Sequence, residues 1–449
     1  MEALSQILDK VDGLIWGAPL LIALMAVGIM LTAKLHLIQV SNLILSLKLV
    51  FSSKANADDA SKAGDISGFA ALCTALASTI GTGNIVGVAT AVHMGGPGAL
   101  FWMFVAAFFG MATKYSEVLL AVHYREKDKN GEYIGGPMFA IKNGLGKRWV
   151  WLGTAFAIFG GLAGFGIGNM VQVNSMAQAL DSTLHIPTWI TGVITTIIVA
   201  MVTLGGVKRI GKVAEALVPF MCVAYIIAGV VVLVVNAAVI PDAVALIFSS
   251  AFNPVAATGG FAGSVVMMSI RYGVARGVFS NEAGLGTAGI AQAAGTTKSA
   301  VRSGLIGMLG TFIDTLIVCS VTGLAIVSSG VWSNGQSGAA LSAAAFESAM
   351  PGFGGILLTI ALVIFAFTTI LGWSYYGEKC WIYLVGTKSV LPFRLLWVIA
   401  VPFGAISQLD FAWLVADTLN GMMAIPNLLS LLLLSPVILK LTKEYFAKK

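Results

Sequence analysis

Long uncharged apolar runs recur along this sequence and constrain its fold more than any other feature. One of them, APLLIALMAVGIMLTA at residues 18–33, carries no charged side chain. The runs are about 17 to 30 residues long, so a helix that rises about 1.5 Å per residue crosses about 30 Å of hydrocarbon. They lack the alternation of about ten-residue strands that is typical of outer-membrane barrels. The sequence therefore predicts an all-α polytopic membrane protein.

The composition agrees with this class and excludes others. Of the 449 residues, 58% are hydrophobic and 10% are charged, whereas about a quarter are charged in soluble domains. The basic residues are spread over short loops rather than gathered on one domain, so we expect membrane lipids as partners and no nucleic acid. The cysteines have no CxxC spacing, and we interpret them as small buried hydrophobes. They are Cys73, Cys222, Cys319 and Cys380.

Polar breaks divide the chain into eleven predicted transmembrane spans. These cover residues 14–33, 68–93, 97–121, 149–179, 187–203, 212–238, 258–293, 303–326, 353–377, 389–407 and 411–439. Residues 36–66 turn polar too early to cross a membrane, so we interpret them as an interfacial helix and a loop. The predicted organisation is an N-terminal part (1–66), two five-helix units (67–239 and 240–441) and a tail (442–449).

Lysine and arginine predict the orientation. The loops on one side, with the C-terminal tail, hold 22 of these residues, and the other side holds Lys10 alone. Cytoplasmic loops carry such an excess. We therefore expect a multi-pass plasma-membrane protein with its N-terminus outside and its C-terminus in the cytoplasm.

Two of the predicted spans are interrupted by glycine near their middle. The second span contains ALASTIGTGNIVGVATAV (75–92), and the span 258–293 contains RGVFSNEAGLGTA (276–288). If the first span is set aside, these two occupy corresponding positions in two five-helix repeats of opposite orientation. Paired interruptions in inverted repeats indicate a transporter site.

Unwound backbone at this depth frees N–H and C=O groups that lipid cannot satisfy, and it persists where it lines a cavity or meets a ligand. The ends of the half-helices suit a small zwitterion, and free oxygens suit Na⁺. The alternative is that Gly83 and Gly87 form a GxxxG packing motif. Polar neighbours favour a binding site over packing. They are Ser78, Thr79, Thr82 and Asn84 in one break and Ser280, Asn281 and Glu282 in the other.

Two further spans offer polar or aromatic groups to such a site. FAFTTILGWSYYG (365–377) carries Thr368 and Thr369, whose hydroxyls either coordinate a cation with carbonyls of the first broken helix or bond back to their own helix. Trp373, one turn further, is a candidate pocket wall or inner gate. GFGIGNMVQVNS (164–175) carries Phe165 and Gln172, and a membrane-embedded amide needs partners more than a phenyl ring does.

At this point the motifs match a known family. IGTGNIVGVATAVHMGGPGALFWMFV, YIGGPMFAI and RGVFSNEAGLGTA resemble the alanine or glycine:cation symporter family, the sodium:alanine symporters, over essentially the whole chain. The resemblance implies a LeuT-type fold, which is a 5+5 inverted repeat with two discontinuous helices, preceded here by one extra N-terminal helix. It also implies Na⁺-coupled symport of small neutral amino acids, alanine and glycine, into the cell by alternating access. Na⁺ is then the coupling ion, and no organic cofactor is expected.

The resemblance also implies a set of site residues. The substrate is expected to contact Thr79, Gly81, Thr82, Gly83, Phe165, Gln172, Gly277, Ser280, Asn281 and Trp373, with its carboxylate on the N–H groups of Gly81 and Gly83. One Na⁺ is expected between the carbonyls of Ala77 and Ile80 and the hydroxyls of Thr368 and Thr369, and a second beside Thr79 and Asn84. The stretch from Gly277 to Glu282 is expected to face the substrate amine. Neither break carries an aspartate, which favours a compact substrate with its own carboxylate.

Other readings remain open at this stage. Proton coupling is the alternative to Na⁺, with Glu282 or Asp314 as the proton carrier. A membrane-embedded enzyme is remote because the spans contain no HExxH motif and no clustered nucleophile and base. Among the buried charges, we expect Lys114 and Glu117 to form a structural pair. An ion pair between Arg276 and Glu282 is a hypothesis for a gate.

Overall fold

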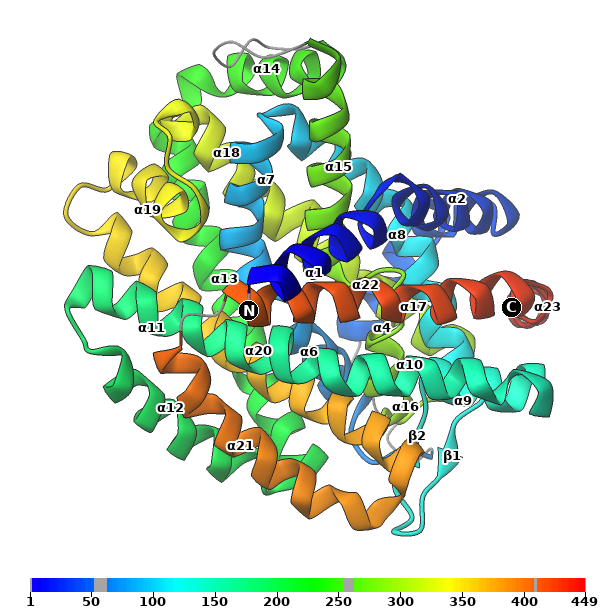
Figure 1. Cartoon of the computed structure of the whole chain (residues 1–449). Coiled ribbons are helices and arrows are strands. Elements are labelled where there is room, and N and C mark those ends of the chain that lie inside the picture. The colour runs from blue at the N-terminus through cyan, green and yellow to red at the C-terminus, as the bar shows by residue number, and fades with distance from the viewer. Residues whose placement is uncertain (1, 52–62, 254–261, 408–409, 449) are drawn as a thin grey trace.

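The computed structural model describes residues 2–51, 63–253, 262–407 and 410–448. Helices dominate it, which confirms the predicted class (Figure 1). Within those residues the one sheet is a hairpin of β1 (Glu126–Lys127) and β2 (Tyr133–Ile134), two antiparallel strands outside the predicted spans.

The N-terminal part contains α1 (Glu2–Ile15), α2 (Ala18–Lys34), α3 (Ile38–Ser41) and α4 (Leu43–Phe51). Helix α2 begins with a proline in its first turn, where the missing N–H costs nothing. Helices α3 and α4 fall where an interfacial helix was predicted. The predicted loop after them lies largely outside the described residues.

The next unit follows the predicted spans closely. Its helices are α6 (Gly68–Thr79), η1 (Gly83–Gly87), α7 (Val88–Gly95), α8 (Gly98–His123), α9 (Pro137–Ala140), η2 (Ile141–Leu145), η3 (Lys147–Trp149), α10 (Val150–Ala163), η4 (Gly164–Met170), α11 (Val171–Leu184), α12 (Thr188–Thr203) and α13 (Gly206–Val235). Helices α6 and α7 are bent by 50° at the break between them. The first predicted discontinuous helix is therefore confirmed.

The remaining helices are η5 (Ala237–Val239), α14 (Ile240–Phe252), α15 (Ala262–Asn281), α16 (Ala288–Ala293), α17 (Ala300–Thr311), η6 (Phe312–Cys319), α18 (Ser320–Ser328), η7 (Val331–Ser333), α19 (Gly338–Ala349), α20 (Gly354–Val385), η8 (Thr387–Ser389), α21 (Val390–Ile406), α22 (Asp410–Leu433) and α23 (Ser435–Ala447). Helices α15 and α16 form the second predicted discontinuous helix. The predicted last span, 411–439, is wrong at its end because the chain bends by 58° between α22 and α23. Pro436 lies in the first turn of α23, and proline cannot continue a preceding helix.

Among the described residues, seven helices are long and apolar enough to cross a membrane, or up to nine if each bent pair counts as one span. Two shorter apolar helices, Thr188–Thr203 and Ala237–Phe252, add to these. Many large apolar side chains are exposed around the body, among them Ile197, Val234 and Phe403, which are 55%, 67% and 57% exposed. Such a surface suits lipid rather than water.

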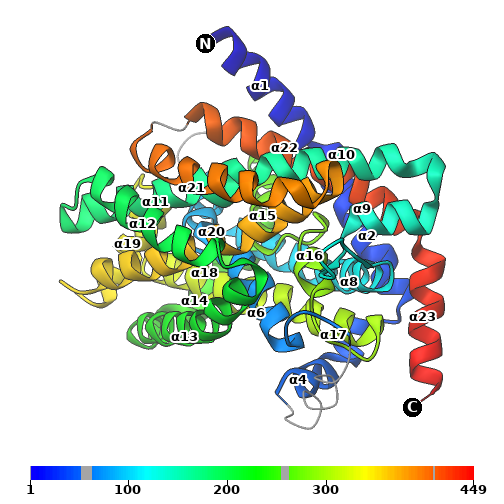
Figure 2. The ribbon, with the colours of Figure 1, turned by 90° about the horizontal axis from the view of Figure 1, so that it is seen from below.

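Two groups of helices pack around the broken ones (Figures 1 and 2). In the first, α8 packs against α15, α16 and α17, and α15 packs against α7; we call α6, α7, α8, α15, α16 and α17 the bundle. In the second, α10 and α11 pack against α20, and α12 packs against α21; we call α10, α11, α12, α20 and α21 the scaffold. Helix α20 contacts α6, so the first broken helix lies at the boundary of the two groups.

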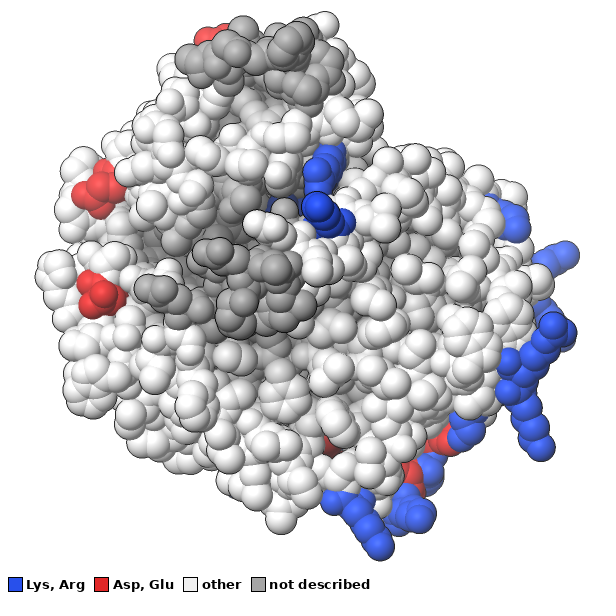
Figure 3. All heavy atoms as spheres, in the orientation of Figure 1, with Lys and Arg blue, Asp and Glu red and all other residues white. Residues whose placement is uncertain are grey.

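Charged side chains mark one end of the molecule. In Figure 3, Lys and Arg gather along the lower right edge, over the β1–β2 hairpin, α9 and α23, and are sparse at the opposite edge near α19. We call the end with the hairpin the lysine-rich end. The loops predicted to be cytoplasmic contribute these side chains.

Candidate functional site

The first break is short and its N–H groups are held by side chains. Ile80 is extended, with φ −79° and ψ 97°, and ends α6. The N–H of Gly81 donates to Asn84 Oδ1 at 2.9 Å, and that of Thr82 donates to Gln172 Oε1 at 3.3 Å. Gln172 belongs to α11, so the scaffold reaches the break directly. The predicted involvement of Gln172 therefore has a geometric basis.

Glycine is required in this break by close approach. A Cβ on Gly81 would overlap the Thr369 hydroxyl, and a Cβ on Gly83 would lie 3.1 Å from Ser280 Cα. A Cβ on Gly87 would meet no heavy atom within 4 Å. Of the two glycines in the GxxxG motif, Gly83 packs closely and Gly87 does not. A GxxxG helix contact therefore does not explain the motif. Gly83 instead brings the first break against the end of α15.

The second break covers Glu282 to Thr287, between α15 and α16. Three of its residues have positive φ: Glu282 at 57°, Gly284 at 99° and Gly286 at 81°. The stretch from Gly277 to Asn281, which was predicted to face the substrate amine, lies just before this break, because α15 stays helical through Asn281. Gly277 packs inside the helix, where an added Cβ would lie 3.2 Å from Met103. The helix instead unwinds after Asn281. Gly284 and Gly286 follow there in the left-handed backbone conformation, which glycine adopts most readily.

A buried glutamate of α8 holds the second break. Glu117 Oε1 accepts the N–H of Gly284 at 2.8 Å, the N–H of Gly286 at 3.0 Å and Asn427 Nδ2 at 2.7 Å. Lys114, the predicted partner of Glu117, makes no hydrogen bond to it, since the buried Lys114 ammonium has no hydrogen-bond partner among the described residues, and the two groups interact through charge alone. Sequence reasoning missed this role for Glu117. The position of the Glu117 carboxylate deep in an apolar span was the one sequence signal that pointed to such a role.

A second carboxylate joins the two breaks. Asp314, which is fully buried, accepts hydrogen bonds from Asn84 Nδ2 at 2.6 Å, Ser280 Oγ at 3.0 Å and Thr315 Oγ1 at 2.6 Å. Asn281 donates to Thr315 Oγ1 at 3.1 Å. Asn84 of the first break and Ser280 next to the second break therefore meet at Asp314, which comes from η6. Hard cations prefer such carboxylate, amide and hydroxyl oxygens.

The two threonines of α20 lie beside the first break. Thr369 Oγ1 is 3.3 Å from the carbonyl oxygen of Ile80 and 2.9 Å from that of Phe365. Thr368 Oγ1 is 2.9 Å from the same Phe365 oxygen. Both hydroxyls thus bond back to their own helix, and that of Thr369 also faces the break. Ala77, the other expected contributor, is buried one turn earlier in α6.

Other predicted site residues lie less directly at the breaks. Thr79 Oγ1 donates to Ala75 O at 2.7 Å within its own helix. Trp373 is 1% exposed, and a Cβ on Gly168 would overlap it. Phe165 packs on Trp397, with ring centroids 5.1 Å apart, and so lies against α21.

Arg276 does not pair with Glu282 as hypothesised. Its guanidinium lies 3.7 Å from the carboxylate of Asp417 in α22. The Glu282 carboxylate accepts the hydroxyl of Thr287 inside the second break. The proposed gate between Arg276 and Glu282 is therefore wrong.

Two broken helices in contact near the middle of an apolar helical body define a secondary transporter of the LeuT type. A solved structure of MhsT in complex with L-phenylalanine has the same fold, with a TM-score of 0.56 at 14% identity over 83% of this chain and 97% of that one. The sodium:alanine symporter family model matches residues 1–449, and the chain belongs to this family. It is a cation-coupled amino-acid symporter of the plasma membrane, not an enzyme.

Two relatives are each 50% identical to this chain. One is the sodium/alanine symporter AgcS of Methanococcus maripaludis, aligned over 98% of this chain and 96% of its own length. The other is an uncharacterized transporter of Haemophilus influenzae, aligned over 99% and 97%. The resemblance inferred from the sequence motifs is therefore confirmed.

Proposed function

We propose that this protein couples the uptake of small neutral amino acids, alanine and glycine, to the Na⁺ gradient by alternating access. The observation that carries the proposal is the approach of Thr369 Oγ1 to the Ile80 carbonyl oxygen at 3.3 Å. Thr369 belongs to the scaffold and Ile80 to the bundle, so a cation between them ties the two groups together. Na⁺ would be held by the carbonyls of Ala77, Ile80 and Phe365 and by the hydroxyls of Thr368 and Thr369.

A second Na⁺ fits beside Asn84. Asp314 lies 2.6 Å from Asn84 Nδ2, and its ionised form would add a negative charge to the amide and hydroxyl oxygens nearby. The Thr79 hydroxyl donates its proton to Ala75 O, which leaves its oxygen lone pairs for the cation, as at the two threonines of α20. The same carboxylate supports the alternative of proton coupling, in which Asp314 carries the proton in place of a second Na⁺.

The substrate carboxylate would take the N–H groups of Gly81, Thr82 and Gly83, with Gln172 moving aside from the N–H of Thr82. The ammonium would face the free carbonyls in the last turn of α15, around Ser280 and Asn281, where the helix dipole favours positive charge. The approach of Gly83 to within contact of Ser280 supports a small substrate. Trp373 would close the pocket on the scaffold side.

We further propose that the lysine-rich end faces the cytoplasm and the N-terminus the exterior, in accord with the excess of lysine and arginine there. The two five-helix units, 67–239 and 240–441, would then be the inverted repeats.

Uptake of radiolabelled alanine into proteoliposomes tests the proposal. An inward Na⁺ gradient should drive accumulation that glycine competes and leucine does not, and equimolar K⁺ should not. Accumulation driven by a proton gradient alone would instead support Asp314 as the coupling site. If no small neutral amino acid accumulates under either gradient, the proposed substrate class is wrong.

A further inference from the structure

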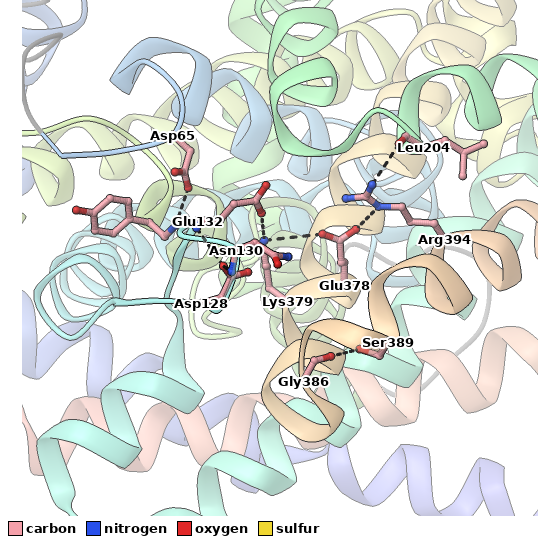
Figure 4. Close-up of polar contacts among 11 residues, drawn as sticks. Asp65, Asp128, Asn130, Glu132, Leu204, Glu378, Lys379, Gly386, Ser389 and Arg394 are labelled. Atoms are coloured by element: carbon pink, nitrogen blue, oxygen red, sulfur yellow. Dashed lines mark hydrogen bonds and ion pairs between the residues drawn. The ribbon is translucent and has the colours of Figure 1, made fainter.

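The β1–β2 hairpin at the lysine-rich end contacts both helix groups. It connects α8 of the bundle to α9, and Figure 4 shows its residues beside the start of α6 and the end of α20. These contacts lie outside the substrate and cation sites described above. Thr369 and Lys379 stand ten residues apart on α20, which places the hairpin contacts about 15 Å along that helix from the cation site.

The ends of the two broken helices are joined beneath the hairpin. The N–H of Asp65 donates to Ala294 O at 2.7 Å, and that of Thr296 donates to Ile66 O at 2.8 Å. Arg125, just after α8, donates to the carbonyls of Ala63 at 2.8 Å and Ala293 at 2.7 Å. The leading segment of α6 and the trailing segment of α16 therefore form one unit that is fixed to α8.

Two adjacent hairpin residues connect this unit to the scaffold. The backbone N–H of Tyr133 donates to Asp65 Oδ2 at 2.7 Å, at the start of α6. The carboxylate of Glu132 lies 2.9 Å from the ammonium of Lys379 in α20, which is 1% exposed. Tyr133 thus contacts the bundle, and Glu132 contacts the scaffold.

The scaffold side of this contact is itself fixed. Glu378 pairs with Arg394 at 2.6 Å, and Arg394 donates to Leu204 O at 3.2 Å (Figure 4). These residues belong to α20, α21 and the end of α12. Contacts among three scaffold helices therefore fix the end of α20 that carries Lys379.

We propose that residues 126–134 form a clasp that closes the cytoplasmic exit of the transporter, and that the contact of Glu132 with Lys379 or of Tyr133 with Asp65 breaks once per cycle. The inference rests on the proposed function. Helices α6 and α20 are in contact, so an exit between the bundle and the scaffold at the lysine-rich end opens only when the start of α6 moves away from α20. Within the described residues, Glu132 bridges from the hairpin to Lys379 of α20, and Tyr133 bridges to Asp65 at the start of α6. These two contacts therefore form the gate.

The same hairpin supplies a matched control. Glu126 pairs with Lys142 at 2.9 Å, and its side chain is 34% exposed, against 38% for Glu132. This pair joins the hairpin to η2 and does not reach α20. Replacing Glu126 removes the same charge from the same hairpin and leaves the contacts of Glu132 with Lys379 and of Tyr133 with Asp65 in place.

Alkylation of Cys73 by a maleimide in the purified full-length protein, followed by mass spectrometry, tests the clasp. Cys73 is 2% exposed on the side of α6 that faces Cys222 of α13, so it reacts when α6 moves. Glu132→Gln should speed its alkylation about fivefold, because a partly exposed ion pair restrains the closed state modestly. Glu126→Gln should leave the rate at the wild-type value.

A second pair of variants tests the other half of the clasp. Asp65→Ala removes the acceptor for Tyr133 and should speed alkylation, whereas Asp65→Asn keeps an acceptor oxygen and should not. Equal rates for Glu132→Gln and Glu126→Gln, or for Asp65→Ala and Asp65→Asn, would overturn the proposal. Because alkylation needs no substrate, this result is independent of whether alanine is transported.

Discussion

The hydroxyl of Thr369 lies 3.3 Å from the carbonyl oxygen of Ile80, across the boundary between scaffold and bundle. The carbonyl is exposed to this contact because α6 ends at the residue before it. A Cβ on Gly81 would overlap the same hydroxyl, so the glycine and the threonine together define the place for a coupling ion.

Thr369→Ala should weaken activation of transport by Na⁺. A hydroxyl that binds a charged group contributes more than a neutral hydrogen bond, so we expect the half-saturating Na⁺ concentration to rise about tenfold or more. Thr369→Ser retains the oxygen and should stay near the wild-type value. Uptake measured against Na⁺ concentration checks this, and unchanged Na⁺ activation in Thr369→Ala would remove Thr369 from the site.

Gly81→Ala should abolish uptake, whereas Gly87→Ala should be tolerated. The first substitution places a methyl group on the Thr369 hydroxyl, and the second meets open space. Replacing an unconstrained helical glycine by alanine is stabilising by about 0.4–1 kcal/mol. Uptake and thermal unfolding of both variants in detergent provide the check. Active Gly81→Ala protein would show that the break relaxes around a side chain.

Gln172→Glu should weaken substrate binding selectively. Its oxygen lies 3.3 Å from the N–H of Thr82, so the change puts a negative charge beside the position proposed for the substrate carboxylate. We expect the KM for alanine to rise about tenfold or more through like-charge repulsion. Gln178→Glu, the same change further along α11, is the control. An equal KM in both variants would place the carboxylate elsewhere.

Glu117→Gln should destabilise the second break. Glu117 accepts two backbone N–H groups and one amide, and hydrogen bonds to a charged acceptor contribute about 1.5–3 kcal/mol. The variant should therefore lower the melting temperature and reduce uptake about tenfold. Ser116→Ala, which removes a bond within α8, should change neither. A stable and fully active Glu117→Gln protein contradicts this assignment.

Asp65 should make stability depend on pH. Burial raises the pKa of its carboxyl, with the Glu132 charge adding to the rise and the Tyr133 N–H opposing it. A raised pKa in the folded state means that protonation stabilises the fold, fully below about pH 4 and less as pH rises through the raised value. The melting temperature of wild type relative to Asp65→Asn should therefore fall from pH 4 to pH 7. A difference that stays constant or grows over this range would contradict the burial argument.

Several of these features followed from the sequence. Both broken helices and the position of Thr369 beside the first break were predicted, because glycines and polar residues inside apolar runs have few structural uses. Gln172 was predicted as a site residue, but its contact with the first break was not. The start of the second break was not, since Gly277 and Gly284 look alike in sequence and only the latter has positive φ.

Long-range partners were also beyond prediction. Glu117 was assigned to Lys114 three residues away, whereas its contacts are Gly284, Gly286 and Asn427, more than 160 residues away along the chain. The clasp depends on the meeting of three distant segments, the hairpin, Asp65 and Lys379, which no local pattern encodes. The bend before α23 had a local signal in Pro436, which the continuous apolar run obscured.

The most direct test of the account is alanine binding to the purified protein, measured by calorimetry over a range of Na⁺ concentrations at constant ionic strength. If Na⁺ and substrate share the breaks, affinity for alanine should rise with Na⁺ and fail to rise with K⁺, and alanine should raise the affinity for Na⁺ by the same factor. Alanine binding that is indifferent to Na⁺ would contradict the central claim that the two broken helices bind both together.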